Sequence, residues 1–317
     1  MSGILGERLV SVIMSVHNGL RYLPDAVNSI LSQSYTSIEF IVIDDGSTDG
    51  STEWLKARAD QDDRLKLICL QRVGLTKALN QGLSAVRGAY VARMDADDVA
   101  HSSRLEKQLE FLKANLDVVC CGTHCRYMDE SGNFLFVRKM PQTHEDIEEC
   151  HLAGRGGFIL HPSSMMRTQS LIEVGGYDES FSCAQDYDLW FRLARVGRLA
   201  NLPDVLLDYR ITGSAITQAR RLEQAHCCAR IIDRELHLRG LGVSKILPPT
   251  YDIRPVDPWW VLVKSSECGY WKVSWRYSLK VVRVSLKTIL RCAWRLVAAV
   301  PLAAVSTIRS LVQRKSL

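Results

Sequence analysis

Short apolar runs alternate with amphipathic segments over residues 9–120. In the amphipathic segments, apolar side chains recur at three- and four-residue spacing, which is typical of helices that bury one face. The apolar runs have the length of buried strands and occupy residues 10–16, 40–43, 65–70 and 89–94. Strands that alternate with helices pair in parallel, so we expect an α/β fold with a mostly parallel sheet flanked by helices.

Two of the amphipathic segments carry helix-start signals. Pro24 suits the first turn of a helix over residues 23–31. Ser103 and Glu106 have the spacing of a capping box, which predicts a helix that begins at this point. Both signals support the alternation of strands and helices.

Polar residues directly follow three of the predicted strands. They occupy residues 15–18, 44–47 and 95–98. The carboxyl ends of parallel strands lie at one edge of the sheet, and open α/β sheets bind their ligands there. We therefore expect these three segments to converge on one ligand site.

The densest acidic segment is Asp95-Ala96-Asp97-Asp98. Three carboxylates this close repel one another, and a hard divalent cation such as Mn²⁺ or Mg²⁺ relieves that repulsion. Such a cation usually also binds phosphate oxygens of a substrate. The alternative is a solvated turn in which Asp98 caps the following segment. The sequence contains neither a G-x-G-x-x-G dinucleotide motif nor a P-loop.

Several ordered motifs resemble those of glycosyltransferase family 2. They are S-V-I-M-S-V-H-N at 11–18, I-L-S-Q at 30–33, I-D-D-G-S-T-D at 43–49, A-L-N-x-G at 78–82, A-R-M-D-A-D-D at 92–98, G-G-Y-D-E at 175–179 and Q-D-Y-D-L-W at 185–190. The resemblance covers roughly residues 9–215. It implies an inverting enzyme with a GT-A fold, of the type that builds bacterial surface polysaccharides.

The resemblance assigns five residues to the donor site. Ser15 and His17 match the positions that hold the nucleoside, and Asp45 matches a carboxylate that accepts a hydrogen bond from the base. That hydrogen bond favours uracil, and so a UDP-sugar. Asp97 matches the direct ligand of the metal ion, Mn²⁺ or Mg²⁺, while Asp95 lies toward the ribose or the metal. The metal ion would neutralise the departing diphosphate.

The same resemblance assigns residues around the leaving group and the acceptor. Lys77 is expected to add positive charge beside the diphosphate, with a solvated surface charge as the alternative. Asp186 matches the general base that deprotonates the acceptor hydroxyl, with a helix N-terminal charge as the alternative. Gln185 replaces the first acid of the family's usual Glu-Asp pair, which is expected to make Asp186 less basic. His161 is expected near the acceptor or the pyrophosphate and Trp190 at the sugar subsite, and a purely structural role fits each of them as well.

Charge is unevenly distributed along the chain. The net charge is +5, but residues 264–317 hold eleven basic residues and one acid, and residues 1–263 are net acidic. An acidic body argues against nucleic acid as a partner. Six basic residues follow helical spacing in the tail: Arg276, Lys280, Arg283, Lys287, Arg291 and Arg295.

This basic stripe and the tryptophans near it predict an amphipathic helix that binds an anionic membrane surface through residues 276–315. The alternative is a helix packed on the catalytic domain with a solvated basic face. A spanning helix is not expected. The longest charge-free stretch, 296–308, contains Pro301 and is shorter than the roughly 20 residues that a bilayer needs.

The predicted organisation has three parts. They are a GT-A catalytic domain over 1–217 (nucleotide-binding half 1–100, acceptor half 101–217), a helical extension and linker over 218–258, and the basic amphipathic tail over 259–317. The N-terminus lacks the basic segment of a secretory signal, and the ten cysteines form no C-x-x-C pattern, which is typical of free thiols in a reducing cytoplasm. We expect a cytoplasmic protein, peripheral on the inner face of the cell membrane.

The expected function is transfer of a single sugar from a nucleotide-diphosphate donor, a UDP-sugar, to a hydroxyl of a glycan or lipid-linked acceptor in cell-surface polysaccharide synthesis. Two alternatives stay open. A nucleotidyltransferase also uses paired aspartates, but the glycine-rich basic loop after its first strand is missing here. A non-catalytic sugar-nucleotide-binding or membrane scaffold protein of the same fold is compatible with Gln185.

Overall fold

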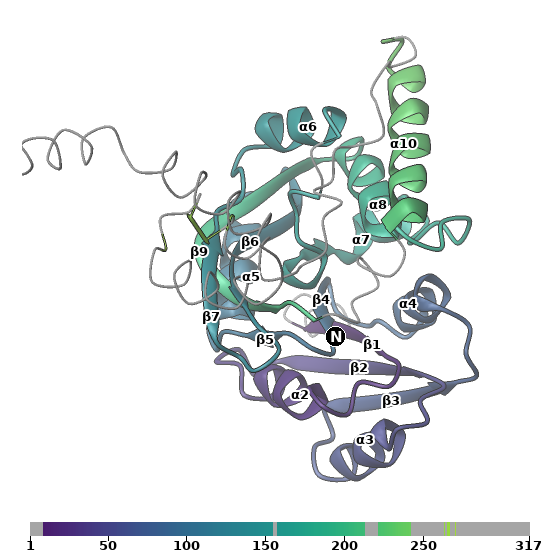
Figure 1. Cartoon of the computed structure of the whole chain (residues 1–317), viewed down its shortest axis with the longest axis vertical. Helices are drawn as coiled ribbons and strands as arrows, with labels where there is room; N and C mark the ends of the chain where they lie inside the picture. Colours follow the sequence, from purple (N-terminus) through teal and green to yellow (C-terminus); the bar gives the residue numbers. More distant parts are fainter. Residues whose placement is uncertain are drawn as a thin grey trace, which may run out of the picture. The chain divides into compact units, whose positions relative to one another are not determined.

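The computed structural model describes residues 9–154, 157–212 and 221–241, together with Val263, Ser265, Ser266 and Tyr270. Strands and helices alternate in the first half (Figure 1). Its elements are β1 (Val10–Val16), α2 (Leu23–Leu31), β2 (Ile38–Asp45), α3 (Ser51–Ala59), β3 (Leu65–Leu70), α4 (Leu75–Ser84), β4 (Tyr90–Asp95) and β5 (Val99–Ala100). Those of the second half are α5 (Arg104–Ala114), β6 (Val118–Met128), β7 (Phe134–Arg138), α6 (His144–Leu152), the 3₁₀ turn η1 (His161–Ser163), β8 (Met165–Arg167), α7 (Thr168–Glu173), α8 (Gln185–Ala194), β9 (Arg198–Arg210) and α10 (Arg221–Leu238).

The first half forms a parallel sheet around β1. Strand β1 pairs in parallel with both β2 and β4, and β3 pairs in parallel with β2. Helix α4 packs on β1 and β2, where Ala78 and Leu79 join the same apolar cluster as Ile13 and Ile43. A Cβ atom on Gly82 would lie 2.6 Å from Ile43 Cδ1, so a larger residue there would force Ile43 to move, and glycine lets α4 approach the sheet closely.

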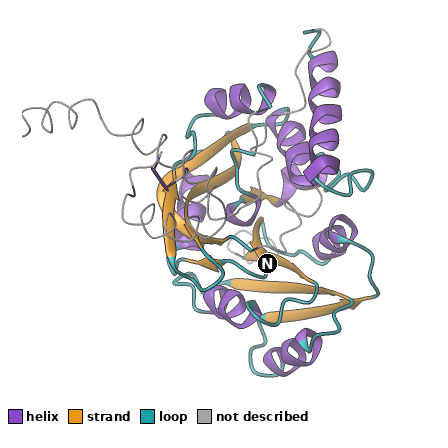
Figure 2. Cartoon of the chain, in the orientation of Figure 1, coloured by secondary structure: helices purple, strands orange, loops and turns teal. Residues whose placement is uncertain are grey.

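Beyond β4 the sheet continues with antiparallel strands. The described residues form one nine-stranded sheet of order β3-β2-β1-β4-β8-β6-β9-β5, with β7 paired to β6. Figure 2 draws the strands in orange and the helices in purple. The pairs β4–β8, β6–β8 and β5–β9 are antiparallel. The expected parallel pairing therefore holds for β1 to β4 and does not extend into the second half.

Helix α5 begins at the predicted position but without the predicted capping box. Ser103 is the N-cap residue, yet its side chain makes no capping hydrogen bond. Glu106 Oε2 instead accepts a hydrogen bond from Ser34 Oγ at 2.7 Å. The backbone N–H of Leu105 donates to Gln33 Oε1 at 3.0 Å, so a side chain that follows α2 takes over the capping role.

Helix α10 lies within the predicted helical extension and packs on α8 and α6. Its side chains Cys228, Ile231 and Ile232 join Tyr187 and Phe191 of α8 in a second apolar cluster. This packing fixes the position of α8, whose first turn belongs to the site described below.

Contacts divide the chain into two compact units. The first comprises Met1–Tyr127, Val137–Arg210 and Ser214–Ile253, and the second Met128–Phe136, Ile211–Gly213 and Arg254–Leu317. Within the second unit, the Ile211 N–H donates to the Met128 backbone oxygen at 2.9 Å. The basic stripe and the 296–308 stretch of the predicted tail lie outside the described residues. Among the helices that are described, none combines the length and the apolar character that crossing a bilayer requires.

Candidate active site

The three polar segments predicted from the sequence lie together at one edge of the sheet. The register places Ser15 of β1 beside Asp95 of β4. The segments after β1 and β2 are joined by Asn18, whose Oδ1 accepts a hydrogen bond from the Thr48 N–H at 2.7 Å. The predicted convergence of the ends of β1, β2 and β4 is therefore confirmed by the strand pairing.

His17 lies exposed at this edge with its ring orientation fixed. Its Nδ1 lies 2.9 Å from the backbone oxygen of Asp45, an arrangement that requires a proton on Nδ1. Its Nε2 lies 3.3 Å from Asn18 Nδ2, which suits Nε2 as the acceptor. His17 is thus held at the end of β2 in one tautomer.

Asp45 is buried at the end of β2, with 3% of its surface exposed. Its two carboxylate oxygens accept hydrogen bonds from the backbone N–H groups of Val73 (2.6 Å) and Gly74 (2.9 Å). Asp45 therefore fixes the segment between β3 and α4 at the edge of the site. Each oxygen keeps a second lone pair, and contact with a nucleobase stays a prediction.

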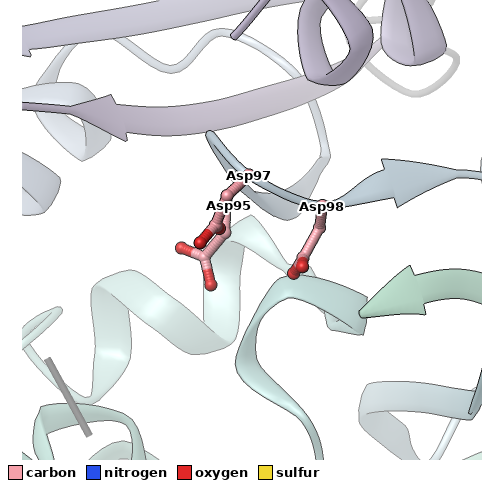
Figure 3. Close-up of side chains that lie close together, drawn as sticks. All are labelled: Asp95, Asp97 and Asp98. Carbon is pink, nitrogen blue, oxygen red and sulfur yellow. The ribbon is translucent and has the colours of Figure 1, made fainter. Parts of the chain in front are cut away.

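Asp95, Asp97 and Asp98 form a cluster of carboxylates, with one oxygen from each lying within 4.8 Å of the others. Figure 3 shows the carboxylates of Asp95 and Asp97 projecting side by side, with that of Asp98 next to them. Arg93 Nη2 donates to Asp95 Oδ1 at 2.5 Å. Asp95 and Asp97 are partly buried and Asp98 is buried.

The electrostatics of this cluster suit a divalent cation. Burial and the charge of Asp95 raise the pKa of Asp97 to about 7. Burial and the charges of Asp97 and Asp95 raise the pKa of Asp98 well above its ordinary value. A bound cation would stabilise the ionised carboxylates. Carboxylate oxygens are the ligands that Mg²⁺ and Mn²⁺ prefer, so the residues present fit the predicted metal.

Asp98 faces β9. The alternative predicted from the sequence was that Asp98 caps the segment that follows it. Its Oδ1 accepts the backbone N–H of Arg210 at 2.8 Å, and its buried Oδ2 has no hydrogen-bond partner among the described residues. Arg210 Nε donates to the backbone oxygen of Asp97 at 2.8 Å, and its guanidinium lies over the Tyr22 ring. Arg210 thus brings a positive charge to the cluster that the sequence pattern did not predict.

Asp186 lies in the first turn of α8, two residues after a strained backbone position. Ala184 has a φ of 58°, in the left-handed region that residues other than glycine rarely adopt. Burial raises the pKa of Asp186, and Asp95 acts in the same direction while Arg93 opposes it. Asp186 therefore lies within electrostatic reach of the β4 cluster, and burial increases its basicity although Gln185 adds no charge.

His161 and Trp190 pack together in the core. One ring nitrogen of His161 lies 2.7 Å from the Tyr177 hydroxyl, and the rings of His161 and Trp190 meet edge-on at 6.0 Å. Burial and the charge of Arg93 lower the pKa of His161 well below its ordinary value, so the ring is neutral. Trp190 is 0% exposed. This burial agrees with the alternative in which Trp190 packs in the core and does not line a sugar subsite. An acceptor role for His161 stays a prediction.

Helix α4 presents Lys77 to solvent and connects the two halves of the site through Asn80. Asn80 Nδ2 donates to the Tyr177 backbone oxygen at 2.9 Å and to Glu179 Oε1 at 2.9 Å, and its Oδ1 accepts the Tyr177 N–H at 3.0 Å. Asn80 and the G-G-Y-D-E segment were both visible as motifs, but only the fold shows that they bind each other.

Comparison with protein families decides the assignment. The family model described as Glycosyl transferase family 2 matches residues 11–175, more than half of the chain. The chain belongs to glycosyltransferase family 2. This family 2 member is 32% identical over 250 residues to an uncharacterized glycosyltransferase of Haemophilus influenzae, a match that covers 74% of this chain and 76% of that one. It is 34% identical over 225 residues to the O-antigen biosynthesis glycosyltransferase WbnJ of Escherichia coli, covering 70% and 86% of the two chains.

Solved structures of glycosyltransferases share the fold of this family 2 chain. Mannosyltransferase PcManGT from Pyrobaculum calidifontis, in complex with GDP-Man and Mn²⁺, matches with a TM-score of 0.57 at 18% identity over 94% of this chain and 82% of that chain. S. aureus TarS 1–349, in complex with UDP-GlcNAc, matches with a TM-score of 0.56 at 18% identity over 92% and 81%. The GT-A fold implied by the sequence motifs is therefore confirmed.

Proposed function

We propose that this family 2 glycosyltransferase moves one sugar, with inversion, from a nucleotide-diphosphate donor to a hydroxyl of a glycan or lipid-linked acceptor. The observation that supports it most is that the acidic cluster of β4 and Asp186 of α8 lie within electrostatic reach of each other at the edge where β1, β2 and β4 end. An inverting displacement needs both a group that neutralises the leaving diphosphate and a base for the acceptor hydroxyl.

The donor that we propose is a UDP-sugar bound together with Mn²⁺ or Mg²⁺. The names of the structural relatives support a nucleotide sugar, since they describe TarS with UDP-GlcNAc and PcManGT with GDP-Man and Mn²⁺. Ser15 and His17 would hold the nucleoside, and Asp45 would accept the uracil N3–H. The solvent-exposed Lys77 would add positive charge near the diphosphate.

The acidic residues would divide the chemistry between them. Asp97 would bind the metal directly, and Asp95 would face the ribose or the metal. The metal, when bound, supplies positive charge that neutralises the diphosphate as it leaves. Asp186 would accept the proton of the acceptor hydroxyl on a carboxylate oxygen while that hydroxyl attacks the anomeric carbon from the face opposite the diphosphate. A single displacement of this kind inverts the anomeric configuration.

The acceptor that we propose belongs to cell-surface polysaccharide synthesis. The similarity to WbnJ, an O-antigen biosynthesis glycosyltransferase, supports this class. We also propose that residues 276–315 hold the enzyme on the anionic inner face of the cell membrane, and that 1–217, 218–258 and 259–317 act as catalytic domain, extension and tail. A lipid-linked acceptor at the same surface would then be within reach.

A turnover screen tests the proposed reaction. The full-length protein is incubated with UDP- and GDP-sugars and Mn²⁺, and release of the nucleoside diphosphate is measured with and without lipid-linked acceptors. We expect turnover with a UDP-sugar, and NMR of the product should show the anomeric configuration opposite to that of the donor. Donor binding without any turnover would favour a non-catalytic scaffold, and retention of configuration would contradict the single displacement.

A further inference from the structure

Arg93 is a buried charged residue beside the site to which the proposed mechanism gives no role. It lies in β4 with 1% of its surface exposed. Its Nη2 donates to Asp95 Oδ1, whereas its Nε and Nη1 have no hydrogen-bond partner among the described residues. Burying guanidinium N–H groups without partners costs free energy, so the presence of this arginine in the core needs a reason.

The strand geometry places Arg93 between the acidic cluster and α8. Arg93 and Asp95 are two residues apart in β4, so their side chains lie on the same face of the sheet. Val91, on the same face, belongs to the apolar cluster that contains Trp190. Trp190 follows Asp186 by one helical turn, so both lie on one side of α8. The effect of Arg93 on the pKa of Asp186 agrees with this placement.

A second buried arginine shows that Arg93 differs from a purely structural one. Arg104 is 0% exposed and donates to the backbone oxygens of Arg93 (2.7 Å) and Ser164 (3.2 Å) and to Gln108 Oε1 (3.0 Å). Its partners are neutral groups of the core. Arg93 instead holds one oxygen of a carboxylate whose side chain remains 33% exposed. The exposed part of Asp95 is therefore oriented by a group that is itself fixed in the core.

We propose that Arg93 is a positioning residue, whose guanidinium fixes Asp95 Oδ1 so that Oδ2 faces the metal and the donor. What Asp95 binds rests on the proposed function. Arg93 has two opposing effects on a cation: its charge repels the ion, and its hydrogen bond orients the ligand. Neutralising Arg93 would strengthen cation binding if charge dominated, and it weakens cation binding if positioning dominates.

Mn²⁺ binding to the full-length protein distinguishes these effects without turnover. Free Mn²⁺ is measured by electron paramagnetic resonance during titration of wild type and Arg93→Gln, with Mn²⁺ alone and with Mn²⁺ plus UDP. We expect affinity to fall about 10- to 100-fold in Arg93→Gln, as for other residues that orient a metal ligand. Arg93→Lys should be intermediate, and Arg64→Gln, which removes an Arg–Asp pair in the turn before β3, should bind as wild type does.

A double-mutant cycle shows whether Arg93 acts through Asp95. In an Asp95→Asn background, Arg93→Gln should weaken Mn²⁺ binding no further. Thermal denaturation monitors folding, and Arg93→Lys replaces Arg93→Gln in the cycle if the neutral variant does not fold. Unchanged or tighter Mn²⁺ binding in the Arg93 variant, additive losses, or a wild type that binds no Mn²⁺ with or without UDP would overturn the proposal. A wild type that binds Mn²⁺ but turns over no nucleotide sugar contradicts the proposed function instead, and the cycle still decides the role of Arg93.

Discussion

Burial raises the pKa of Asp186 above its ordinary value, which makes its carboxylate a better proton acceptor. Asp186→Asn keeps the shape of the side chain and removes its basicity. We expect kcat to fall about 10²- to 10⁴-fold, the usual range for loss of a general base. UDP affinity, measured by calorimetry, should stay unchanged because the proposed mechanism places Asp186 at the acceptor hydroxyl and not at the nucleotide. Asp233→Asn, an exposed position on α10, is the control. Wild-type turnover in Asp186→Asn would place the base elsewhere.

Glu39 stabilises the opposite end of β2 and makes stability depend on pH. Burial opposes its ionisation, but hydrogen bonds from Ser11, Lys66 and Arg87 outweigh burial and lower its pKa to about 2. Because the folded-state pKa lies below the ordinary value of 4.5, this contribution is fully present above pH 4.5 and is lost as pH falls toward 2. We expect Glu39→Gln to lose about 1–3 kcal/mol of unfolding free energy at pH 7.

Urea unfolding at several pH values checks the Glu39 prediction. The difference between wild type and Glu39→Gln should shrink as pH falls from 4.5 toward 2, because the wild-type carboxylate becomes protonated. Glu53→Gln, in which an acid on the surface helix α3 is neutralised, should show no such trend. A difference that stays constant from pH 7 to pH 2 would contradict the assignment.

The charged residues at the ends of the apolar runs of β2 and β4 were predictable from the sequence, whereas those within the runs were not. The acids of 44–45 and 95–98 were visible because they end apolar runs, where a polar cluster predicts a ligand site. Arg93 and Glu39 lie among apolar residues of buried strands. Glu39 is explained by a partner from another segment, Ser11, and Arg93 by its hydrogen bond to Asp95 in the same strand. The sequence pattern also did not predict the partners of Asp45, which are the N–H groups of Val73 and Gly74.

At the scale of elements, α8 is held in place by a buried ion network that reaches α10. Asp188 is 0% exposed and pairs with Arg192 at 2.6 Å and with Arg234 of α10. Arg192 Nη1 also donates to the backbone oxygens of Val174 (2.7 Å) and Gly176 (2.6 Å). The first turn of α8, which carries Asp186, is thus connected to α10 and to the G-G-Y-D-E segment.

Removal of Arg234 tests this network. Arg234→Gln leaves Asp188 with one ionic partner in the core, and we expect a loss of about 1–3 kcal/mol of unfolding free energy. Arg239→Gln, directly after the end of the same helix, is the control, since it breaks the more exposed pair with Glu148 and should cost less than about 1 kcal/mol. Equal losses in the two variants, measured by urea unfolding, would show that the buried network adds nothing to stability.

Elements with a long apolar pattern were predictable, and short ones were not. Strands β1 to β4 and helices α2 and α4 appear where the apolar spacing predicted them. Strand β5 has two residues and β8 has three, which is too few to show a periodicity. The antiparallel pairing of these strands could therefore not be predicted from the sequence. The cap of α5 comes from Gln33, far away in the sequence, because the tertiary contact replaced the local capping box.

At the scale of the whole molecule, the contrast between an acidic body and a basic tail predicts membrane binding. Each basic residue near an anionic leaflet contributes about 1 kcal/mol, and salt weakens this attraction. We expect the full-length protein to sediment with anionic vesicles more than with neutral ones, and less at high salt. Replacing the six residues of the basic stripe by Gln should remove the preference for anionic vesicles while donor turnover in solution continues. Equal sedimentation with both kinds of vesicle would favour a packing role for the tail.

Metal-dependent sugar transfer at Asp95, Asp97 and Asp98 is tested by UDP-sugar turnover of the full-length protein as the metal is removed and returned. We predict turnover with Mn²⁺ or Mg²⁺, loss of turnover in excess EDTA, and recovery when metal is added back. Asp97→Ala should stay inactive at saturating metal while keeping the wild-type melting temperature. Full activity in excess EDTA, or wild-type turnover in Asp97→Ala, would contradict the account.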